Sequence, residues 1–261
     1  MNRIEQKFRE LKTKNKKAFI AYIMAGDPNL KTTYELVLEL ERRGVDIMEL
    51  GVPFSDPIAD GPTIQKAGLR ALRNKVDLKD ILNLVKQLRK RTELPLVLMS
   101  YLNLIYCYGI ERLIKEARDK GVDGMIVPDL IPEEAEDLLK IAKANEFSTI
   151  FLASPTSTPE RIKKIAEAST GFIYYVSLTG VTGTRDKLPA GLREAVLKIK
   201  EITPKPVCVG FGISQRKQVE EILKFSDGIV VGSAIVEIIE RNINKPDLVK
   251  KVGIFVNRLS G

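Results

Sequence analysis

Apolar and polar positions follow two different periods along the whole chain. Short runs rich in β-branched and other apolar residues predict eight strands, at residues 19–24, 46–50, 95–100, 124–127, 149–153, 172–177, 207–210 and 228–231. Between them, apolar residues recur at positions i, i+3, i+4 and i+7, which predicts amphipathic helices, for example at 110–117, 135–142 and 192–199. Strands that are apolar on both faces and separated by helices are typical of a parallel sheet. Eight such units predict an α/β protein with a closed (β/α)8 barrel, the TIM barrel.

Residues at the predicted helix ends agree with this arrangement. Thr158 precedes Pro159 at the start of one helix, and Pro132 is expected to open another. Gly44 and Gly121 lie where left-handed residues end helices.

The chain is expected to form one TIM-barrel domain, residues 1–261, with an extra N-terminal helix. In residues 1–14 the apolar side chains of Ile4, Phe8 and Leu11 share one side, which would cap the lower end of the barrel. A chain of 261 residues can bury the core of such a barrel, and no linker or low-complexity tract divides it.

Composition excludes several classes of protein. Hydrophobic residues make up 44% of the chain and charged residues 29%, and no apolar run approaches the ~20 residues that cross a bilayer. The first residues contain no apolar segment of a secretory signal. We therefore expect a soluble, cytoplasmic protein that does not insert into membranes. Despite a net charge of +8, we expect no nucleic-acid partner, because Lys and Arg are spread among Glu and Asp along helical faces.

The residue types that are missing narrow the chemistry. Without histidine, acid–base work falls to Asp, Glu, Tyr, Lys or Cys. Cys107 and Cys208 are far apart in the sequence, which predicts reduced thiols and no metal site. The predicted strands contain no Lys, which disfavours a Schiff-base aldolase, and the lack of His and paired Cys disfavours a zinc aldolase. A carboxylate site acting on a phosphorylated substrate remains. If that site breaks a carbon–carbon bond, the substrate must supply its own electron sink.

Two connections that follow predicted strands are long. Residues 51–61 follow the second strand and residues 178–189 follow the sixth, whereas such loops usually have about 2 to 6 residues. Both lie at the C-terminal ends of strands, the face that carries the active site in TIM barrels.

Glu49 ends the second strand. Side chains alternate along a strand, so Ile47 and Glu49 share one face, while Met48 and Leu50 share the other. The apolar pair suits the outer helices, which points Glu49 into the barrel mouth. The alternative is a strand-end carboxylate that contacts solvent or a Lys. Burial would raise the pKa of Glu49 toward neutrality and allow it to donate and accept a proton.

Two further acids lie in the loop after Glu49. Asp60 precedes Gly and Pro, so it either caps the next helix or faces the same pocket as Glu49. Asp56 precedes Pro57 and is interpreted as a turn residue or an exposed contact.

Glycine clusters follow the last three predicted strands. They contain Gly183, Gly210 with Gly212, and Gly232 with Ser233. Glycines allow backbone N–H groups to approach a ligand, and a helix starting at Ser233 would add its N-terminal dipole. TIM barrels commonly bind phosphate after strands seven and eight. Plain turns at strand ends are the alternative.

Eight blocks of sequence carry a likeness to one family. They read FIAYIMAGDP, MELGVPFSDPIADGPTIQKA, LMSYLNLIYCYG, VPDLIPEE, FLASPTSTPERI, IYYVSLTGVTGTR, VGFGIS and VVGSAIV. In this order they resemble the tryptophan synthase alpha chain family from end to end. The second block is highly specific, and the others are weaker individually.

The resemblance implies a lyase of tryptophan biosynthesis that splits indole-3-glycerol phosphate into indole and glyceraldehyde 3-phosphate. Glu49 would be the general acid–base that protonates C3 of the indole ring, and the protonated ring would serve as the electron sink. Asp60 would bind the indole N–H and stabilise the positive charge that develops.

The resemblance also implies the residues that bind the substrate: Tyr22, Tyr174, Thr182, Gly183, Phe211, Gly212, Gly232 and Ser233. Tyr22 and Phe211 would line the indole ring, Tyr174 would lie beside the substrate, and Thr182 would belong to a lid loop. Backbone groups around the glycines and the serine would hold the phosphate. Ordinary barrel packing is the alternative for the three aromatic residues.

A partner is implied as well. It would be a tryptophan synthase beta chain that carries pyridoxal phosphate, in an α2β2 heterotetramer, while this chain holds no cofactor and no metal. Pro53 and Asp56 resemble positions that touch the partner, with simple turn chemistry as the alternative. Met24, Leu102 and Leu104 stand where the family pattern leads us to expect Thr, Tyr and Pro, which affects the expected shape of the pocket and of the partner surface.

Two other functions stay open. One is another phosphosugar barrel, such as an isomerase or a relative that forms indole-3-glycerol phosphate, which a strand lysine would have supported. The other is a barrel kept as a scaffold that activates a beta-type partner. Indole release by the chain alone, and then with a partner added, separates these possibilities.

Overall fold

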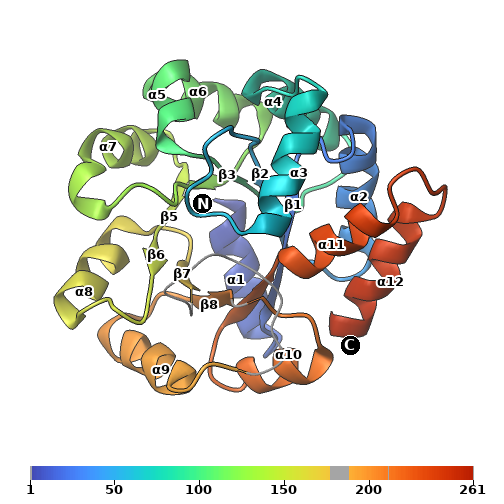
Figure 1. Ribbon diagram of the computed structural model, residues 1–261. Coiled ribbons are helices and arrows are strands. Elements are labelled where there is room, and N and C mark those ends of the chain that lie inside the picture. Colours follow the sequence, from blue (N-terminus) through green and yellow to red (C-terminus); the bar gives the residue numbers. More distant parts are fainter. Residues whose placement is uncertain (1, 177–187, 211, 261) are drawn as a thin grey trace.

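The structure, a computed structural model, describes residues 2–176, 188–210 and 212–260. Within them a parallel sheet lies at the centre and helices surround it (Figure 1). The strands are β1 (Ala18–Met24), β2 (Ile47–Gly51), β3 (Leu96–Met99), β4 (Gly124–Ile126), β5 (Ser148–Ile150), β6 (Leu152–Ala153), β7 (Ile173–Val176), β8 (Val207–Gly210) and β9 (Gly228–Val231).

The helices fill the connections between these strands and cover the outside of the sheet (Figure 1). They are α1 (Arg3–Thr13), α2 (Leu30–Arg42), α3 (Pro62–Arg73), α4 (Leu78–Leu88), α5 (Leu102–Tyr108), α6 (Ile110–Lys120), the 3-10 helix η1 (Pro132–Glu134), α7 (Glu136–Ala144), α8 (Pro159–Ala168), α9 (Leu192–Ile202), α10 (Arg216–Ile222), α11 (Ser233–Arg241) and α12 (Leu248–Ser260).

The barrel closes through a strand that is present in two pieces. The strands pair in parallel in the order β5-β4-β3-β2-β1-β9-β8-β7-β6. β5 pairs with β4 and β6 pairs with β7, and Phe151 joins the two halves. The carbonyl of Phe151 also accepts a hydrogen bond from the backbone N–H of Tyr174, at 3.1 Å. The predicted TIM barrel is confirmed, with the strand expected at 149–153 divided between β5 and β6.

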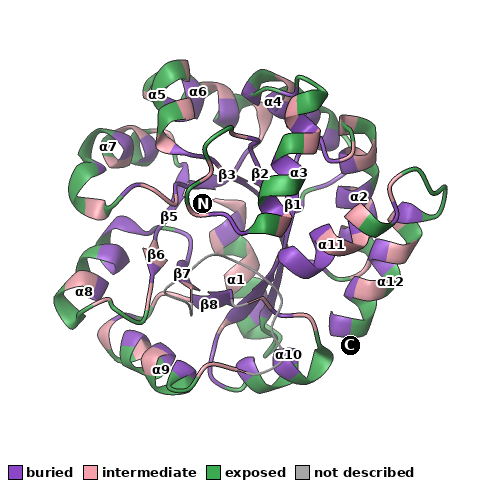
Figure 2. Cartoon of the chain, in the orientation of Figure 1, coloured by how far each residue is buried: buried purple, intermediate pink, exposed green. Residues whose placement is uncertain are grey.

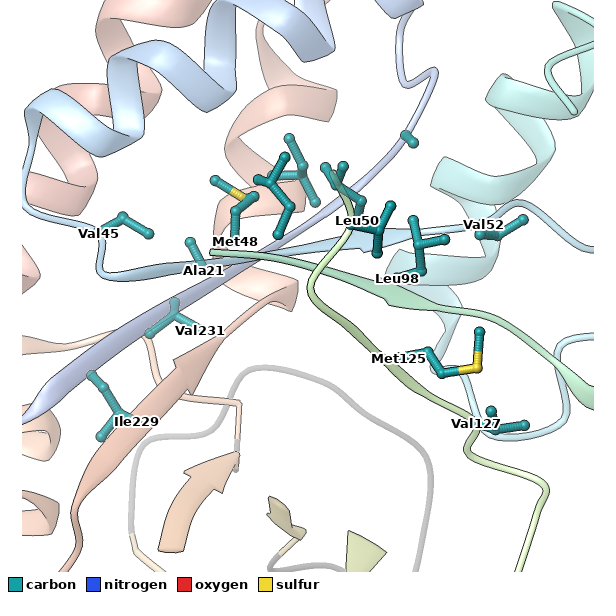
Figure 3. Packing of buried hydrophobic residues seen from close by; sticks show 14 of the residues in the cluster. Ala21, Val45, Met48, Leu50, Val52, Leu98, Met125, Val127, Ile229 and Val231 are labelled. Atoms are coloured by element: carbon teal, nitrogen blue, oxygen red, sulfur yellow. The ribbon is translucent and has the colours of Figure 1, made fainter. Parts of the chain in front are cut away.

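Side chains of β2 alternate between the inside and the outside of the barrel. Ile47 belongs to the buried cluster that fills the interior, while Met48 and Leu50 belong to the larger cluster between the strands and the helices (Figure 3). The helices are buried on the side that faces the sheet and exposed on the other (Figure 2). The alternation predicted from the sequence therefore holds, and it places Glu49 on the inner side.

Most of the predicted helix ends are present. The Thr158 hydroxyl caps α8 by accepting a hydrogen bond from the N–H of Arg161, at 3.3 Å. Gly121 ends α6 with φ +98°, and Gly44 follows α2 with φ +87°.

The expectation for Pro132 was wrong. It opens the short 3-10 helix η1, and α7 begins four residues later, at Glu136. The reason lies at Ala135, where φ −97° and ψ 9° depart from α-helical values and interrupt the helix. A proline therefore marked a helical turn here but not the start of the longer helix.

Helix α1 closes the N-terminal end of the barrel. Ile4 and Leu11 are buried among interior side chains that include Ile20, Ile47 and Phe172. This confirms the predicted cap.

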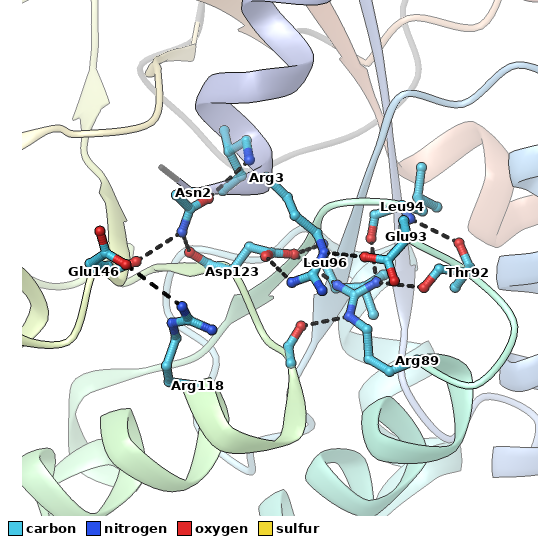
Figure 4. Close-up of polar contacts among 12 residues, drawn as sticks. Asn2, Arg3, Arg89, Thr92, Glu93, Leu94, Leu96, Arg118, Asp123 and Glu146 are labelled. Carbon is cyan, nitrogen blue, oxygen red and sulfur yellow. Dashed lines mark hydrogen bonds and ion pairs between the residues drawn. The ribbon is translucent and has the colours of Figure 1, made fainter.

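The side chain of Asp123 anchors α1 below the strands (Figure 4). Its carboxylate accepts hydrogen bonds from Arg3 Nη1 at 3.1 Å and from Arg89 Nη2 at 2.7 Å. It also accepts the backbone N–H of Leu96 at 2.8 Å. These bonds satisfy a buried charge that would otherwise destabilise the fold, and they join α1 to the end of α4 and to the start of β3.

Candidate active site

Glu49 lies inside the barrel near the C-terminal ends of the strands. Its side chain is 0% exposed, and neither carboxyl oxygen has a hydrogen-bond partner among the residues that the structure describes. Burial of this unpaired group raises its pKa to about 8. The side chain is therefore mostly protonated at neutral pH and able to give up a proton, as predicted from its place on the strand.

Two tyrosines on the inner side of the barrel lie close to Glu49. Tyr22 of β1 is the register partner of Glu49 in the sheet, and Tyr174 lies on β7. Burial raises the pKa of both phenols, and the negative charges of Glu49 and Asp60 raise them further. Both phenols thus stay protonated, and they line the same site as the two acids.

Glycines at strand ends make room for these tyrosines. A Cβ atom on Gly210 would lie 2.5 Å from Tyr174 Cε2 and 2.6 Å from its hydroxyl. A Cβ atom on Gly51 would overlap the hydroxyl of Tyr22. The strand-end glycines therefore create the space of the pocket, and Gly51 is a site residue that the sequence analysis missed.

Asp60 reaches the same pocket from the loop after β2. It is 5% exposed, and burial raises its pKa to about 6, although a hydrogen bond with Tyr101 opposes the rise. The N-cap of α3 is Gly61 rather than Asp60. The capping alternative is therefore wrong, and the carboxylate of Asp60 instead lies close enough to Tyr22 and Tyr174 to raise the pKa of both phenols.

Tyr101 holds this loop in place. Its hydroxyl accepts a hydrogen bond from the N–H of Ala59 at 3.1 Å, and its ring packs on Phe54, with ring centroids 5.3 Å apart. Together with its hydrogen bond to Asp60, these contacts connect Tyr101 to three residues of the Asp60 loop. The sequence analysis did not single out Tyr101. Its place directly after the third strand, at the same end of the barrel as Glu49, was the available signal.

An ion cluster fixes the helix that follows Asp60. Arg70 of α3 contacts the buried carboxylate of Asp27 in a fork, with Nε at 2.7 Å and Nη2 at 2.8 Å from its oxygens. Arg70 Nη1 also lies 3.1 Å from Glu240 of α11. Because α3 begins two residues after Asp60, these contacts help to set where the Asp60 loop returns to the barrel.

Two segments for which phosphate binding is expected, the turn after β8 and the start of α11, are described in part. Ser233 is the first residue of α11, no side chain caps that helix within the described residues, and Gly212 has φ +74° after β8. A Cβ atom on Gly232 would lie 3.3 Å from Tyr22. The N-terminal end of α11 therefore lies beside Tyr22.

The other predicted positions have different outcomes. Thr182, Gly183 and Phe211 lie outside the described residues. Pro53 is buried, whereas Asp56 is exposed in a turn, where its carboxylate accepts a hydrogen bond from Ser55 Oγ. Within the described ranges no group of three or more metal-binding side chains gathers. In the same part of the chain, no helix is long and apolar enough to cross a bilayer.

Comparison with known proteins identifies the family of this chain. A family model described as tryptophan synthase alpha chain matches residues 8–258. The chain belongs to the tryptophan synthase alpha chain family. This confirms the family to which the eight sequence blocks pointed, and with it a lyase subunit of tryptophan biosynthesis that works with a beta chain.

Individual relatives agree over nearly their full length. The tryptophan synthase alpha chain of Thermoanaerobacter sp. (strain X514) is 46% identical over 99% of this chain and 98% of its own. That of Geotalea uraniireducens is 48% identical over 99% of this chain and 97% of its own. A crystal structure of tryptophan synthase subunit alpha from Legionella pneumophila superposes with a TM-score of 0.93 at 39% identity and covers 100% of this chain and 97% of that one.

Proposed function

We propose that residues 1–261 form a single domain that cleaves indole-3-glycerol phosphate into indole and glyceraldehyde 3-phosphate, with Glu49 as general acid–base. The observation that carries the assignment is the protonated carboxyl group of Glu49, which is buried near Tyr22 and Tyr174 and has no hydrogen-bond partner within the described part of the chain, in a member of this family. A neutral acid in a dry pocket is suited to protonating carbon, because its proton is not held by another group.

The reaction follows from proton transfer at two atoms. Glu49 gives its proton to C3 of the indole ring, which places a positive charge on the ring nitrogen. The resulting carboxylate then accepts the proton of the side-chain hydroxyl next to the scissile bond. A carbonyl forms at that carbon, and the electrons of the broken carbon–carbon bond return to the ring. Glu49 ends the cycle protonated, so no other proton carrier is needed.

Asp60 stabilises the charged intermediate. With a pKa of about 6, its side chain is mostly ionised at neutral pH, whereas Glu49 is mostly neutral. A carboxylate that accepts the indole N–H would stabilise the positive ring. The two acids thus have separate roles because their environments set different pKa values.

The remaining pocket residues hold the substrate. Tyr22 and Phe211 would line the indole ring, Tyr174 would lie beside the substrate, and Thr182 would belong to a lid loop. Backbone N–H groups near Gly183, Gly212, Gly232 and Ser233 bind the phosphate. The start of α11 at Ser233 supports this placement, because the N-terminal end of a helix attracts anions.

Indole release measured with Glu49→Gln tests the proposal. The variant keeps the size of the side chain but has no proton to give, so we expect the rate to fall by roughly 10²–10⁴-fold. Glu111→Gln, an exposed position on α6, is the matched control and should leave the rate unchanged. A Glu49→Gln variant that folds normally and keeps most of the activity would remove Glu49 from the mechanism. A wild-type chain that releases no indole, alone or with a beta chain, would favour a scaffold.

The partner is a beta chain that carries pyridoxal phosphate, in a cytoplasmic α2β2 assembly. Support comes from exposed apolar side chains that follow three neighbouring strands: Ile58 is 77% exposed, Tyr106 58% and Ile131 39%. Asp56 is exposed in the same loop as Ile58, and the buried Pro53 would act by holding that loop in shape.

Binding to a beta chain of the family tests this surface. Ile58→Glu should weaken the complex at least tenfold, because a charge would replace an apolar contact. Leu197→Glu places the same change at an exposed apolar side chain of α9 and should have no effect. Equal effects of both changes would place the interface elsewhere. The mass of the wild-type complex tests the α2β2 stoichiometry.

A further inference from the structure

A hollow of about 800 Å³ lies at the N-terminal end of the barrel, opposite the pocket of Glu49 and Asp60. One side is formed by α1 and the connection from α1 to β1. The other side is formed by the end of α9 and by the turns that precede β7, β8 and β9. Because the strands are parallel, these turns share the end of the barrel that is remote from the active site.

The hollow concentrates positive charge. Its lining includes two carboxylates, Glu5 and Asp227, and six cations, which are Arg9, Lys12, Lys16, Lys17, Lys200 and Lys205. The excess of four positive charges is half of the net charge of +8 carried by the whole chain. The sequence spreads these residues over several segments, so only the fold brings them together.

The cations are incompletely neutralised. Lys17 and Lys200 share a single carboxylate oxygen of Asp227, at 3.4 and 2.7 Å. The ammonium of Lys205 donates to the backbone carbonyls of Ala166 and Ser169, and burial lowers the pKa of this side chain. One carboxylate of Asp227 offsets only one of the two lysine charges, and the neutral carbonyls that contact Lys205 offset none, so an excess of positive charge remains in the hollow.

The α1 wall of the hollow carries cations with no ion pair within the described residues: Arg9, Lys12 and Lys16. Arg9 and Lys12 lie on the same side of α1 as Phe8, which is half-buried. A ligand in the hollow would therefore meet cations on opposite walls.

The opposite flank of α1 shows that this clustering is not a general property of a lysine-rich surface. A second hollow there, of about 730 Å³, is lined by three cations and by five carboxylates, which are Glu10, Glu41, Asp46, Glu93 and Asp123. Its Arg3 is paired with two of these acids, at 2.6 and 3.1 Å. Charge is thus sorted between the two flanks of one helix.

We propose that the basic hollow binds an oligophosphate, an anion with two or more linked phosphate groups. The excess of four positive charges suits a chain of linked phosphates better than a single phosphate group, which carries at most about two negative charges at neutral pH. The volume lies within the ~300–1,000 Å³ of small-molecule sites. The lining also includes the apolar residues Phe8, Leu11 and Pro206, which favours a nucleoside triphosphate over a bare phosphate chain.

Calorimetric titration of the full chain with ATP, tripolyphosphate, AMP and inorganic phosphate, at low ionic strength and without added metal, tests the proposal. ATP should bind more tightly than tripolyphosphate, and AMP and phosphate should bind at least tenfold more weakly than ATP. Equal affinity for ATP and tripolyphosphate would still support the site and would identify the phosphate chain as its ligand. Failure of both to bind would overturn it.

Charge reversal locates the site. The double change Lys12→Glu and Lys16→Glu should weaken ATP binding at least tenfold while indole release and the melting temperature stay as in the wild type. Lys86→Glu with Lys90→Glu is a matched control, because these lysines are also four residues apart, exposed, and at the end of a helix, α4. Equal losses in both variants, or none in the first, would overturn the proposal. The second result would place any bound ATP elsewhere, such as the phosphate site beside α11.

Discussion

Tyr22 packs directly over Gly51, so that a methyl group at position 51 would overlap the tyrosine hydroxyl. The two residues lie near the ends of the adjacent strands β1 and β2, next to Glu49. The backbone of one strand thus forms the seat for a side chain of the next, and the shape of the pocket depends on a residue that has no side chain.

Gly51→Ala is expected to displace Tyr22 and to reduce indole release at least tenfold, because the backbone of β2 has no room to shift in the sheet. Gly68→Ala is the control. A Cβ atom there meets only Met24 Cε, at 3.6 Å, and alanine in a helix should stabilise the fold by about 0.5–1 kcal/mol. Steady-state kinetics and thermal unfolding of both variants check this. Normal activity of Gly51→Ala would show that Tyr22 has another place to go.

The rate of indole release should depend on pH through both acids. Asp60 works ionised, so kcat/KM should rise as pH increases through about 6, and Glu49 works protonated, so kcat/KM should fall as pH increases through about 8. Asp60→Asn should lower the rate by roughly 10²–10³-fold and remove the rise on the acid side. A profile that stays flat from pH 5 to 9 would contradict both assignments.

Tyr101→Phe removes a hydroxyl that interacts with Asp60 and with the N–H of Ala59. In the wild type, the hydrogen bond from Tyr101 lowers the pKa of Asp60, so its loss should raise that pKa and move the acid side of the pH profile to higher pH. Activity should fall about tenfold. Tyr106→Phe changes an exposed hydroxyl on α5 and should alter neither. Loss of activity without a shift of the profile would limit Tyr101 to a structural role.

Glu49 should destabilise the fold at alkaline pH. Its pKa is about 8 in the folded chain and near 4.5 when exposed. The folded state therefore keeps a proton that the unfolded state loses, and its stability falls as pH increases from about 4.5 to 8. Glu49→Gln should be more stable than wild type at pH 8.5, by on the order of a few kcal/mol, and similar to it at pH 4.5. Urea unfolding at both pH values, with Glu111→Gln as control, measures this. If the difference in unfolding free energy between Glu49→Gln and wild type is the same at both pH values, the folded chain does not hold Glu49 in its protonated form.

Arg70→Lys should cost about 2 kcal/mol of unfolding free energy, because lysine cannot form the two-pronged contact with the buried carboxylate of Asp27. It should also raise KM, since α3 positions the Asp60 loop. Arg73→Lys, an exposed change in the same helix, is the control. Equal stability of the two variants would mean that the fork contributes nothing net.

The sequence by itself determined the strands, the barrel and the side of β2 on which Glu49 lies. These follow from local rules, because side chains alternate along a strand and recur at helical spacing whatever the rest of the chain does. The same rules could not decide whether Asp60 caps a helix or faces the pocket.

Only the tertiary structure decided the contacts between segments. It placed Tyr101 against the Asp60 loop, seated Tyr22 on Gly51, divided the fifth strand at Phe151 and gathered six cations from α1, α9 and the turns below the barrel. Each of these depends on contacts between segments that are far apart in the sequence, and the packing of whole elements sets those contacts, whereas no pattern within one element does.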